Sequence, residues 1–306
     1  MSTLHDLIFD YTLRNVALGG MLLGIVAGVL GAFAVLRQQA LLGDSLSHAA
    51  LPGICIAFMI TGSRESLVLL IGAGIAGWIG TWILLRTVNA TKLSEDTMLG
   101  VVLSVFFGVG ILLLTYIQQT NNANQAGLDK YLFGQAASLI ARDVWTFAIL
   151  GTASLAIVVL FYKEFKLLSF DPEFLASLGL PQRRLDLALT SLLVVAVMIG
   201  LQTVGVVLMA AMVIGPGTAA RQWTDNLRTM LMLSGLFGGL AGLIGAVISV
   251  QASHLPTGPS IILTLTIIVV ASILFAPRHG IVAEWWRNRA RRAAFQAALE
   301  SGERPS

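Results

Sequence analysis

Long apolar runs recur along the whole chain, separated by short polar segments. Each run has about 20 residues, which at a rise of 1.5 Å per residue crosses a hydrocarbon core of about 30 Å. The pattern predicts membrane-crossing helices over residues 16–36, 40–61, 67–85, 99–117, 144–162, 187–202, 204–220, 230–250 and 260–276. We therefore expect an all-α, polytopic helical bundle in a membrane, with eight or nine crossings and little room for a soluble domain.

The sixth and seventh runs are short and nearly continuous, which leaves the number of crossings open. Glycine and proline interrupt this stretch at Gly200, Gly205, Gly215, Pro216 and Gly217. Such interruptions are tolerated in a membrane where protein covers the backbone or where the backbone lines a cavity. The stretch is predicted to be a broken helix or a hairpin near residues 200–220.

Charged residues are scarce, and their placement indicates the orientation of the chain. Only 11% of residues are charged and 56% are hydrophobic, whereas soluble domains carry about 25% charged residues. Lys and Arg gather in a few loops and the tail, at Arg37, Arg86, Lys92, Lys163, Lys166, Arg183, Arg184, Arg221, Arg228 and residues 278–292. With nine crossings all these groups fall on one side of the membrane, which by the positive-inside rule is the cytoplasmic side. Four other basic residues, Arg14, Arg64, Lys130 and Arg142, fall on the outer side and are exceptions to the rule. The net charge of +3 is thus a topology signal and does not indicate nucleic acid binding.

The distribution of apolar and basic residues divides the chain into two regions. Residues 1–277 form the predicted transmembrane domain, and residues 278–306 form a basic cytoplasmic tail with Trp285, Trp286 and Phe295. The tail either lies against anionic lipid as an interfacial helix or is a solvated, positively charged anchor. Within the membrane, glycines at four-residue spacing in the first and eighth runs predict close helix packing; they are Gly20, Gly24 and Gly28, then Gly235, Gly239, Gly238 and Gly242, with Ala246.

A carboxylate and an imidazole stand one helical turn apart at the start of the second apolar run. Asp44 and His48 share a helix face, because residues i and i+4 are neighbours on a helix surface. Ionisable groups inside a membrane are costly and usually serve an ion or proton path. One oxygen and one nitrogen ligand suit a divalent transition metal, so the pair predicts a metal-binding half-site. The alternative is that the two side chains bind each other and hold helices together.

The loop between the fifth and sixth runs contains the signals of a short capped helix. Asp171 is placed at the N-cap, Pro172 at the first helical position, Glu173 in the first turn and Gly179 at the C-cap. With Phe170 and Phe174 exposed, this helix could be a docking knob for a cytoplasmic partner. An ordinary interfacial loop helix is the alternative, since aromatic residues also anchor at membrane surfaces.

ATP hydrolysis by this chain itself cannot be the source of energy for transport. No Gly-x4-Gly-Lys-Ser/Thr motif occurs in the sequence, so the usual phosphate-binding loop is absent. Energy comes either from another subunit or from a gradient, and in the second case Asp44 and His48 would relay protons or ions in a secondary transporter. A membrane-embedded enzyme would need more polar groups than this one pair.

Several sequence blocks, in order, resemble the permease subunits of the manganese, zinc and iron ABC transporters over nearly the whole chain. The blocks are Gly43-Asp44-Ser45-Leu46-Ser47-His48-Ala49 with Leu51-Pro52-Gly53, Ser94-Glu95-Asp96 followed by Gly100, Asp129-Lys130-Tyr131-Leu132-Phe133-Gly134, Ser169-Phe170-Asp171 with Ala176 and Gly179, and Val204-Gly205-Val206-Val207-Leu208 leading to Pro216 and Ala219-Ala220. The basic tail is longer than the core of the family requires. The resemblance implies a fold like that of type II ABC importers, in a bacterial plasma membrane.

The resemblance also implies partners and roles for residues. Asp44 and His48 would be the translocation-site ligands for manganese first, then zinc or iron, with no permanently bound cofactor. A second permease chain, identical or closely related, would complete the pathway, an extracytoplasmic binding protein would deliver the metal, and a cytoplasmic ATPase dimer would carry the ATP. The segment that would couple to the ATPase comprises Phe170, Asp171, Pro172, Glu173, Phe174, Ala176 and Gly179.

Three further polar residues are weaker candidates. Glu95 and Asp96 follow Ser94, which is expected to be the N-cap of the fourth helix, and they could have a minor role at the cytoplasmic exit. His254 lies between the last two runs, where it could touch an arriving metal or be a surface histidine without ligand partners.

Overall fold

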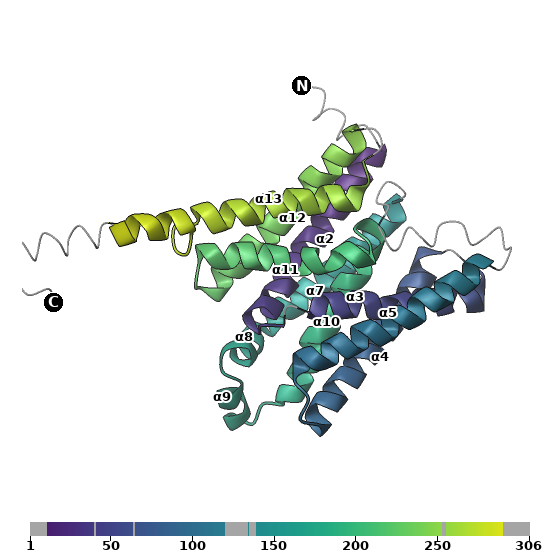
Figure 1. Ribbon diagram of the computed structural model, residues 1–306, viewed down its shortest axis with the longest axis horizontal. Coiled ribbons are helices and arrows are strands. Elements are labelled where there is room, and N and C mark those ends of the chain that lie inside the picture. The colour runs from purple at the N-terminus through teal and green to yellow at the C-terminus, as the bar shows by residue number, and fades with distance from the viewer. Residues whose placement is uncertain are drawn as a thin grey trace, which may run out of the picture.

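The computed structural model describes residues 11–39, 41–63, 65–119, 134, 139–252 and 255–289. Helices and short turns make up these residues, and none of the residues just named lies in a β-strand. The helices are α2 (Tyr11–Leu36), α3 (Leu42–Thr61), α4 (Ser66–Ala90), α5 (Glu95–Gln119), α7 (Ala141–Leu160), α8 (Tyr162–Phe170), α9 (Pro172–Ser177), α10 (Gln182–Thr203), α11 (Val206–Trp223), α12 (Leu227–Gln251) and α13 (Thr257–Phe275). In Figure 1, α2 runs through the middle of the bundle, with α3, α4 and α5 on one side and α12 and α13 on the other.

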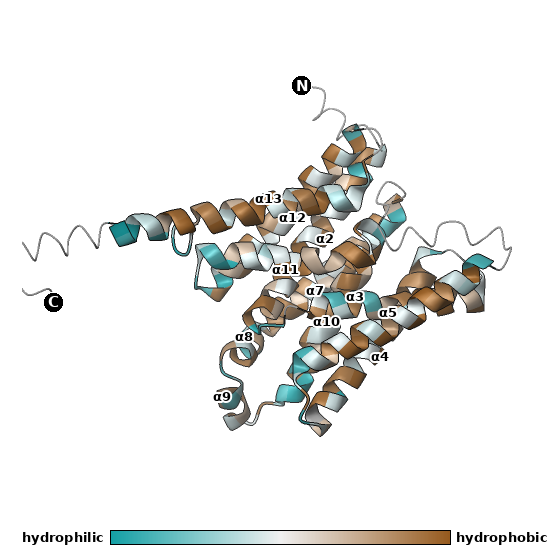
Figure 2. Ribbon diagram, viewed as in Figure 1, coloured by the Kyte–Doolittle hydropathy of each residue, from teal (hydrophilic) through white to brown (hydrophobic). Residues whose placement is uncertain are grey.

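Eight of these helices are long and apolar enough to cross a membrane: α2, α3, α4, α5, α7, α10, α12 and α13. Their outer faces carry large apolar side chains that are exposed, among them Leu112 of α5, Ile149 of α7 and Leu263 of α13. Figure 2 shows these helices brown over most of their length and teal at their ends. An exposed apolar surface of this extent matches contact with lipid. The predicted all-α membrane bundle is confirmed.

Polar contacts sort the helix ends into two groups. At what we call the basic end, Arg37 at the end of α2 binds Asp186 near the start of α10. At the opposite end, Tyr11 at the start of α2 accepts a hydrogen bond from the backbone of Ala141 at the start of α7. Within the described part of the chain, Arg14 and Arg142 are the two cationic side chains at the opposite end, in line with the charge distribution predicted from the sequence.

The stretch predicted as a broken helix or hairpin is two helices. α10 ends at Thr203, Gly205 has φ of 88°, and α11 begins at Val206. Because a positive φ is strained for residues with a side chain, glycine at 205 permits the break. α10 reaches the opposite end, where Gln202 donates to Ser66 at the start of α4. α11 returns to the basic end, so it is a ninth segment through the bundle, with Pro216 inside it.

The glycine ridges of the first and eighth runs face each other. A methyl group at Gly24 of α2 would lie 2.0 Å from the carbonyl oxygen of Gly238 of α12, and one at Gly242 would lie 2.0 Å from that of Gly20. The hydroxyl of Ser234 donates to the carbonyl of Gly28, at 2.5 Å. Backbones this close leave no room for side chains, which confirms the packing that the four-residue spacing predicts.

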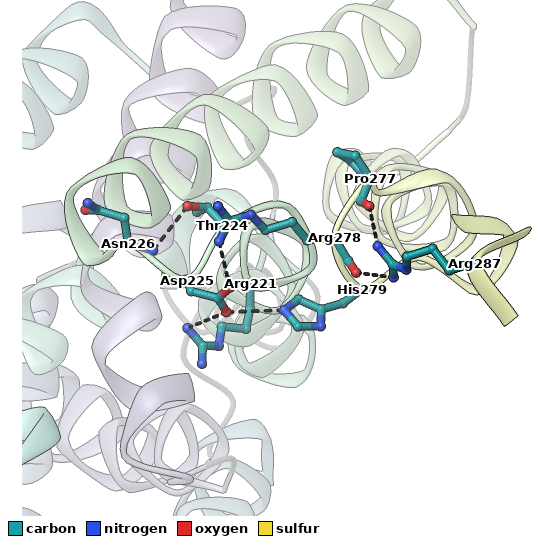
Figure 3. Close-up of polar contacts among 8 residues, drawn as sticks. All are labelled: Arg221, Thr224, Asp225, Asn226, Pro277, Arg278, His279 and Arg287. Atoms are coloured by element: carbon teal, nitrogen blue, oxygen red, sulfur yellow. Dashed lines mark hydrogen bonds and ion pairs between the residues drawn. The ribbon is translucent and has the colours of Figure 1, made fainter. Parts of the chain in front are cut away.

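The first residues of the tail are fastened to the turn between α11 and α12 (Figure 3). The carboxylate of Asp225 in that turn accepts from Arg278 at 2.8 Å and contacts His279 at 3.2 Å and Arg221 at 3.7 Å. Arg287 reaches back to the carbonyls of Pro277 and Arg278, at 3.0 and 2.5 Å. Residues 281–289 are helical and continue away from α13 at the left of Figure 1. Phe295 lies outside the described residues.

Candidate functional site

Asp44 and His48 lie together at the start of α3, as their spacing predicts. The Nε2 atom of His48 is 3.2 Å from Oδ1 of Asp44, and the side chains are 12% and 31% exposed, respectively. Asp44 is in the first turn of α3, where the helix dipole favours a carboxylate. The imidazole packs edge-on against Phe107 of α5, with ring centroids 4.5 Å apart and an interplanar angle of 73°. The pair is therefore a half-buried polar group with a fixed ring orientation.

Neighbouring helices hold this turn in place on two sides. The hydroxyl of Ser45 donates to the carbonyl of Leu99 in α5, at 2.8 Å. Gly43 faces α11, where a methyl group in its place would lie 3.1 Å from Cβ of Val213. One turn after the pair, Pro52 has no N–H to donate to the carbonyl of His48, so the helical hydrogen-bond ladder is interrupted there. The start of α3 is thus fixed at its base and can bend just beyond the pair.

The two side chains can hold a metal ion without moving apart. Ligand atoms about 2.0–2.2 Å from one ion, at angles between a right angle and the tetrahedral value, are about 2.8–3.6 Å from each other. The separation of 3.2 Å between Nε2 and Oδ1 falls in this range. Among the residues that the structure describes, no third His, Cys, Asp or Glu joins the pair. A complete coordination shell therefore needs ligands beyond these two side chains.

One atom of the pair is left without a partner. Nδ1 of His48 is buried and makes no hydrogen bond within the described part of the chain. Buried polar atoms are nearly always paired, and metal-binding histidines usually donate their second nitrogen to an acceptor. This nitrogen is therefore open to an acceptor that the described residues do not supply.

The segment after α7 has the caps that the sequence predicts. The carboxylate of Asp171 accepts from the backbone of Phe174 at 2.9 Å, Pro172 is the first residue of α9, and Gly179 has φ of 73° after the helix. Phe170 and Phe174 are each about half exposed, at 50% and 49%. The last residue of α8 and the first turn of α9 therefore present two aromatic side chains at the basic end of the bundle. Its role as a coupling helix, which also involves Glu173 and Ala176, stays a prediction.

One helix in this region was not predicted. Residues 162–170 form α8, whereas the sequence pattern suggested a loop. Phe165 and Leu168 are buried, three residues apart on one face, and Leu175 of α9 is fully buried. These three side chains anchor α8 and α9 to the bundle. The helical spacing of these apolar residues is present in the sequence, but the charged residues among them, Lys163, Glu164 and Lys166, are typical of a loop.

The weaker candidates have different positions. The hydroxyl of Ser94 accepts from the backbone of Thr97 at 3.3 Å, which confirms it as the N-cap of α5. Glu95 is half-buried and accepts from the side chain of Gln39 at 2.5 Å, while Asp96 is exposed. Since Ser45 binds Leu99, the first turns of α3 and α5 are neighbours, and Glu95 lies at the same end as Asp44. His254 lies outside the described residues, as does the block from Asp129 to Phe133.

Sequence reasoning missed the residues that surround the pair. Phe107 orients the imidazole and Gln39 fixes the preceding turn, yet both look ordinary in the sequence. The one sequence signal that could have identified Gln39 is that it is a polar residue next to two apolar runs. Its partner, Glu95, is in another helix, and that pairing depends on packing.

Comparison with known proteins gives consistent matches. The model of the ABC 3 transport family matches residues 9–276. The zinc transport system membrane protein TroC of Treponema pallidum is 46% identical over 289 residues, covering 94% of this chain and 97% of that protein. The manganese transport system membrane protein MntC of Bacillus subtilis is 47% identical over 266 residues, covering 87% of this chain and 61% of that protein.

A solved structure is also similar. A chain of PsaBC from Streptococcus pneumoniae, solved in complex with Fab, superimposes with a TM-score of 0.80 and 29% identity, over 91% of this chain and 96% of that one. An inward-facing putative metal-chelate type ABC transporter matches with a TM-score of 0.66 and 17% identity, which is a likeness of fold alone.

Proposed function

Because this chain belongs to the ABC 3 transport family and is a membrane permease of a metal ABC transporter, we propose that it imports a divalent transition metal at the cost of ATP hydrolysed by a partner subunit. The observation that carries the proposal is the Asp44 and His48 pair, whose 3.2 Å separation suits one metal ion. An extracytoplasmic binding protein would deliver the ion, and the basic end of the bundle would face the cytoplasm.

A second permease chain fits the incomplete site. Two side chains hold a metal weakly and with little preference, and Nδ1 of His48 lacks a partner among the described residues. A second copy or a close paralogue across the pathway would add ligands and an acceptor. For a carrier that must release its ion, weak binding by each half is an advantage.

Manganese is the first choice of substrate, followed by zinc and iron. A carboxylate suits manganese and an imidazole suits zinc or iron, so the mixed pair discriminates poorly between them. The two relatives above carry zinc and manganese in their names. Selection among metals would then rest mainly with the binding protein.

The coupling step would begin at α9. ATP binding would draw the ATPase subunits together, and α9 would follow through contacts of Phe170 and Phe174, which are half exposed at the basic end. The start of α3 would then change the side to which Asp44 and His48 are open. The interrupted ladder at Pro52 supplies a place at which α3 can bend.

Uptake by proteoliposomes tests the site directly. The complex of permease, ATPase and binding protein is reconstituted, and uptake of manganese, zinc and iron is measured for Asp44→Asn and His48→Ala. His48→Ala removes one ligand and Asp44→Asn replaces a charged carboxylate with a neutral amide, so we expect uptake to fall by more than the roughly 10–100-fold that loss of an outer-shell partner costs. Assembly with the ATPase should be unchanged.

Ser47→Ala is the matched control. Its hydroxyl donates to the carbonyl of Gly43 within the same helix, at 2.7 Å, so its loss removes no interaction with another element. This variant should transport normally. If Asp44→Asn and His48→Ala also transport normally, the pair is not the translocation site.

A further inference from the structure

Two elements that flank α9 in sequence contact the last turn of α2. From α8, the ring of Phe165 meets Phe33 of α2 edge-on, with centroids 6.0 Å apart. From α10, the carboxylate Oδ1 of Asp186 lies 2.5 Å from Nη2 of Arg37. Any displacement of α9 that carries α8 and α10 with it therefore acts on the end of α2.

The Arg37 and Asp186 ion pair is the stronger of these contacts. The two side chains are only 15% and 19% exposed, so water screens their attraction much less than that of a surface pair. Removal of one partner would leave an uncompensated, largely buried charge. By contrast, Arg142 and Glu65 at the opposite end, 3.0 Å apart, are 63% and 50% exposed.

The turn after Arg37 is short and fixed at several points. Gln38 has φ of 58°, an uncommon conformation for a residue with a side chain. Gln39 is 4% exposed, its amide donates to Glu95 of α5 at 2.5 Å, and its carbonyl accepts from the backbone of Leu42 at 3.1 Å. A turn fixed in this way moves as a unit with the helix that it starts.

That helix is α3, and Asp44 is in its first turn. Arg37 is thus linked through one short turn to the helix with Asp44 and His48, and through one ion pair to the helix that follows α9. This path connects the proposed ATPase contact with the proposed metal ligands, although the two are far apart in the sequence.

We propose that Arg37 and Asp186 are positioning residues that transmit the displacement of α9 to the start of α3, and thereby couple ATP hydrolysis to movement of the metal ligands. The proposal rests on the proposed function, since it takes α9 as the ATPase contact and Asp44 with His48 as the metal site. Neither Arg37 nor Asp186 touches the metal in this scheme.

The test is the number of metal ions transported per ATP hydrolysed by the reconstituted complex. Asp186→Asn keeps the size of the side chain and removes its charge. Arg37→Gln removes the other charge, and Arg37→Lys retains it, which suits a contact made through a single nitrogen. Glu65→Gln breaks the ion pair at the opposite end and is the matched control.

We expect Asp186→Asn and Arg37→Gln to hydrolyse ATP at or above the normal rate while metal transported per ATP falls roughly five- to tenfold, in the range of typical coupling energies. Arg37→Lys should keep most of the normal ratio, and Glu65→Gln all of it. A purely structural role would lower the yield of assembled complex and leave the ratio unchanged. A second readout, binding of manganese to the detergent-solubilised complex, should not change in Asp186→Asn.

A normal ratio in both Asp186→Asn and Arg37→Gln would overturn the proposal. That result is distinguishable from failure of the proposed function: Asp44→Asn would still abolish uptake in the first case and would not in the second. An equal loss of ratio in Glu65→Gln would also overturn it, because the effect would then not be specific to this path.

Discussion

Among the polar side chains at the basic end of the bundle, Asp225 has a structural role. Hydrogen bonds from Arg278 and His279 lower the pKa of the Asp225 carboxyl; desolvation opposes them, and the charges of His279 and Arg221 add smaller lowering effects. Asp225 is in the turn between α11 and α12, outside the membrane-crossing segments. Its carboxylate is therefore ionised at neutral pH and fastens the tail to the bundle (Figure 3).

The sign of the pH dependence follows from this shift. A carboxyl whose pKa is lower in the folded state contributes stability above its ordinary value of 3.8 and loses it as the pH falls through the lowered value. We expect Asp225→Asn to speed hydrogen exchange of the backbone over residues 277–289 by roughly two- to fivefold at pH 7, the scale of exposed ion pairs. In the unmodified chain we expect this protection, measured by mass spectrometry, to be retained as the pH falls toward 3.8 and to be lost as it falls further. Glu284→Gln, in the same segment, is the control, and unchanged exchange in Asp225→Asn would contradict the fastening role.

At the scale of elements, α9 is built differently from the helices around it. It has only six residues, yet it has an N-cap, a proline at its first position and a glycine after its end. Because so short a helix is marginal by itself, its caps and the buried side chain of Leu175 hold it in shape. The aromatic side chain of Phe174 in its first turn is exposed.

Replacing the exposed aromatic side chains tests whether the end of α8 and α9 contact the ATPase. Phe170→Ala with Phe174→Ala should weaken binding of the ATPase, because buried aromatic anchors carry much of the free energy of an interface. We expect the dissociation constant for the ATPase to rise at least about tenfold, measured by surface plasmon resonance on permease in nanodiscs. Metal binding to the permease should stay the same. Trp145→Ala, in an exposed position on α7, is the control, and unchanged ATPase binding in the double variant would argue against a coupling role.

At the scale of the whole molecule, the helices form one continuous path between the proposed ATPase contact at Phe170 and Phe174 and the proposed metal ligands Asp44 and His48. α8 and α10, which flank α9 in sequence, meet α2 at its last turn, and α2 leads directly into α3 with Asp44 and His48. α2 is in turn locked to α12 through their glycines. Such an arrangement suits movement imposed from outside the membrane more than a proton relay, which would need ionisable groups in several helices.

The energy source separates these two classes of transporter. In vesicles containing permease, ATPase and binding protein, we expect metal uptake to require ATP and to persist when an uncoupler collapses the proton gradient. A hydrolysis-deficient ATPase should abolish uptake although the complex still forms. Uptake that continues without the ATPase and stops with the uncoupler would make the chain a gradient-driven transporter.

The sequence by itself determined those features whose partners are near one another in the chain. The apolar runs define the membrane helices because each crosses a layer of fixed thickness. Asp44 and His48 meet because they are one helical turn apart, and Asp171, Pro172 and Gly179 define α9 because caps act on adjacent backbone groups. Glycine and proline over residues 200–217 predicted an interruption, and the structure places it at Gly205, between α10 and α11.

Only the tertiary structure decided which distant residues meet. Arg37 with Asp186, Gln39 with Glu95, and Asp225 with Arg278 each join separate elements. Their pairing depends on how the helices pack against one another, which the spacing of residues along the chain does not reveal. The contact between Asp44 and His48 was therefore predictable from the sequence, whereas the contacts that hold this pair and link it to α8 and α10 became visible only when the helices were assembled.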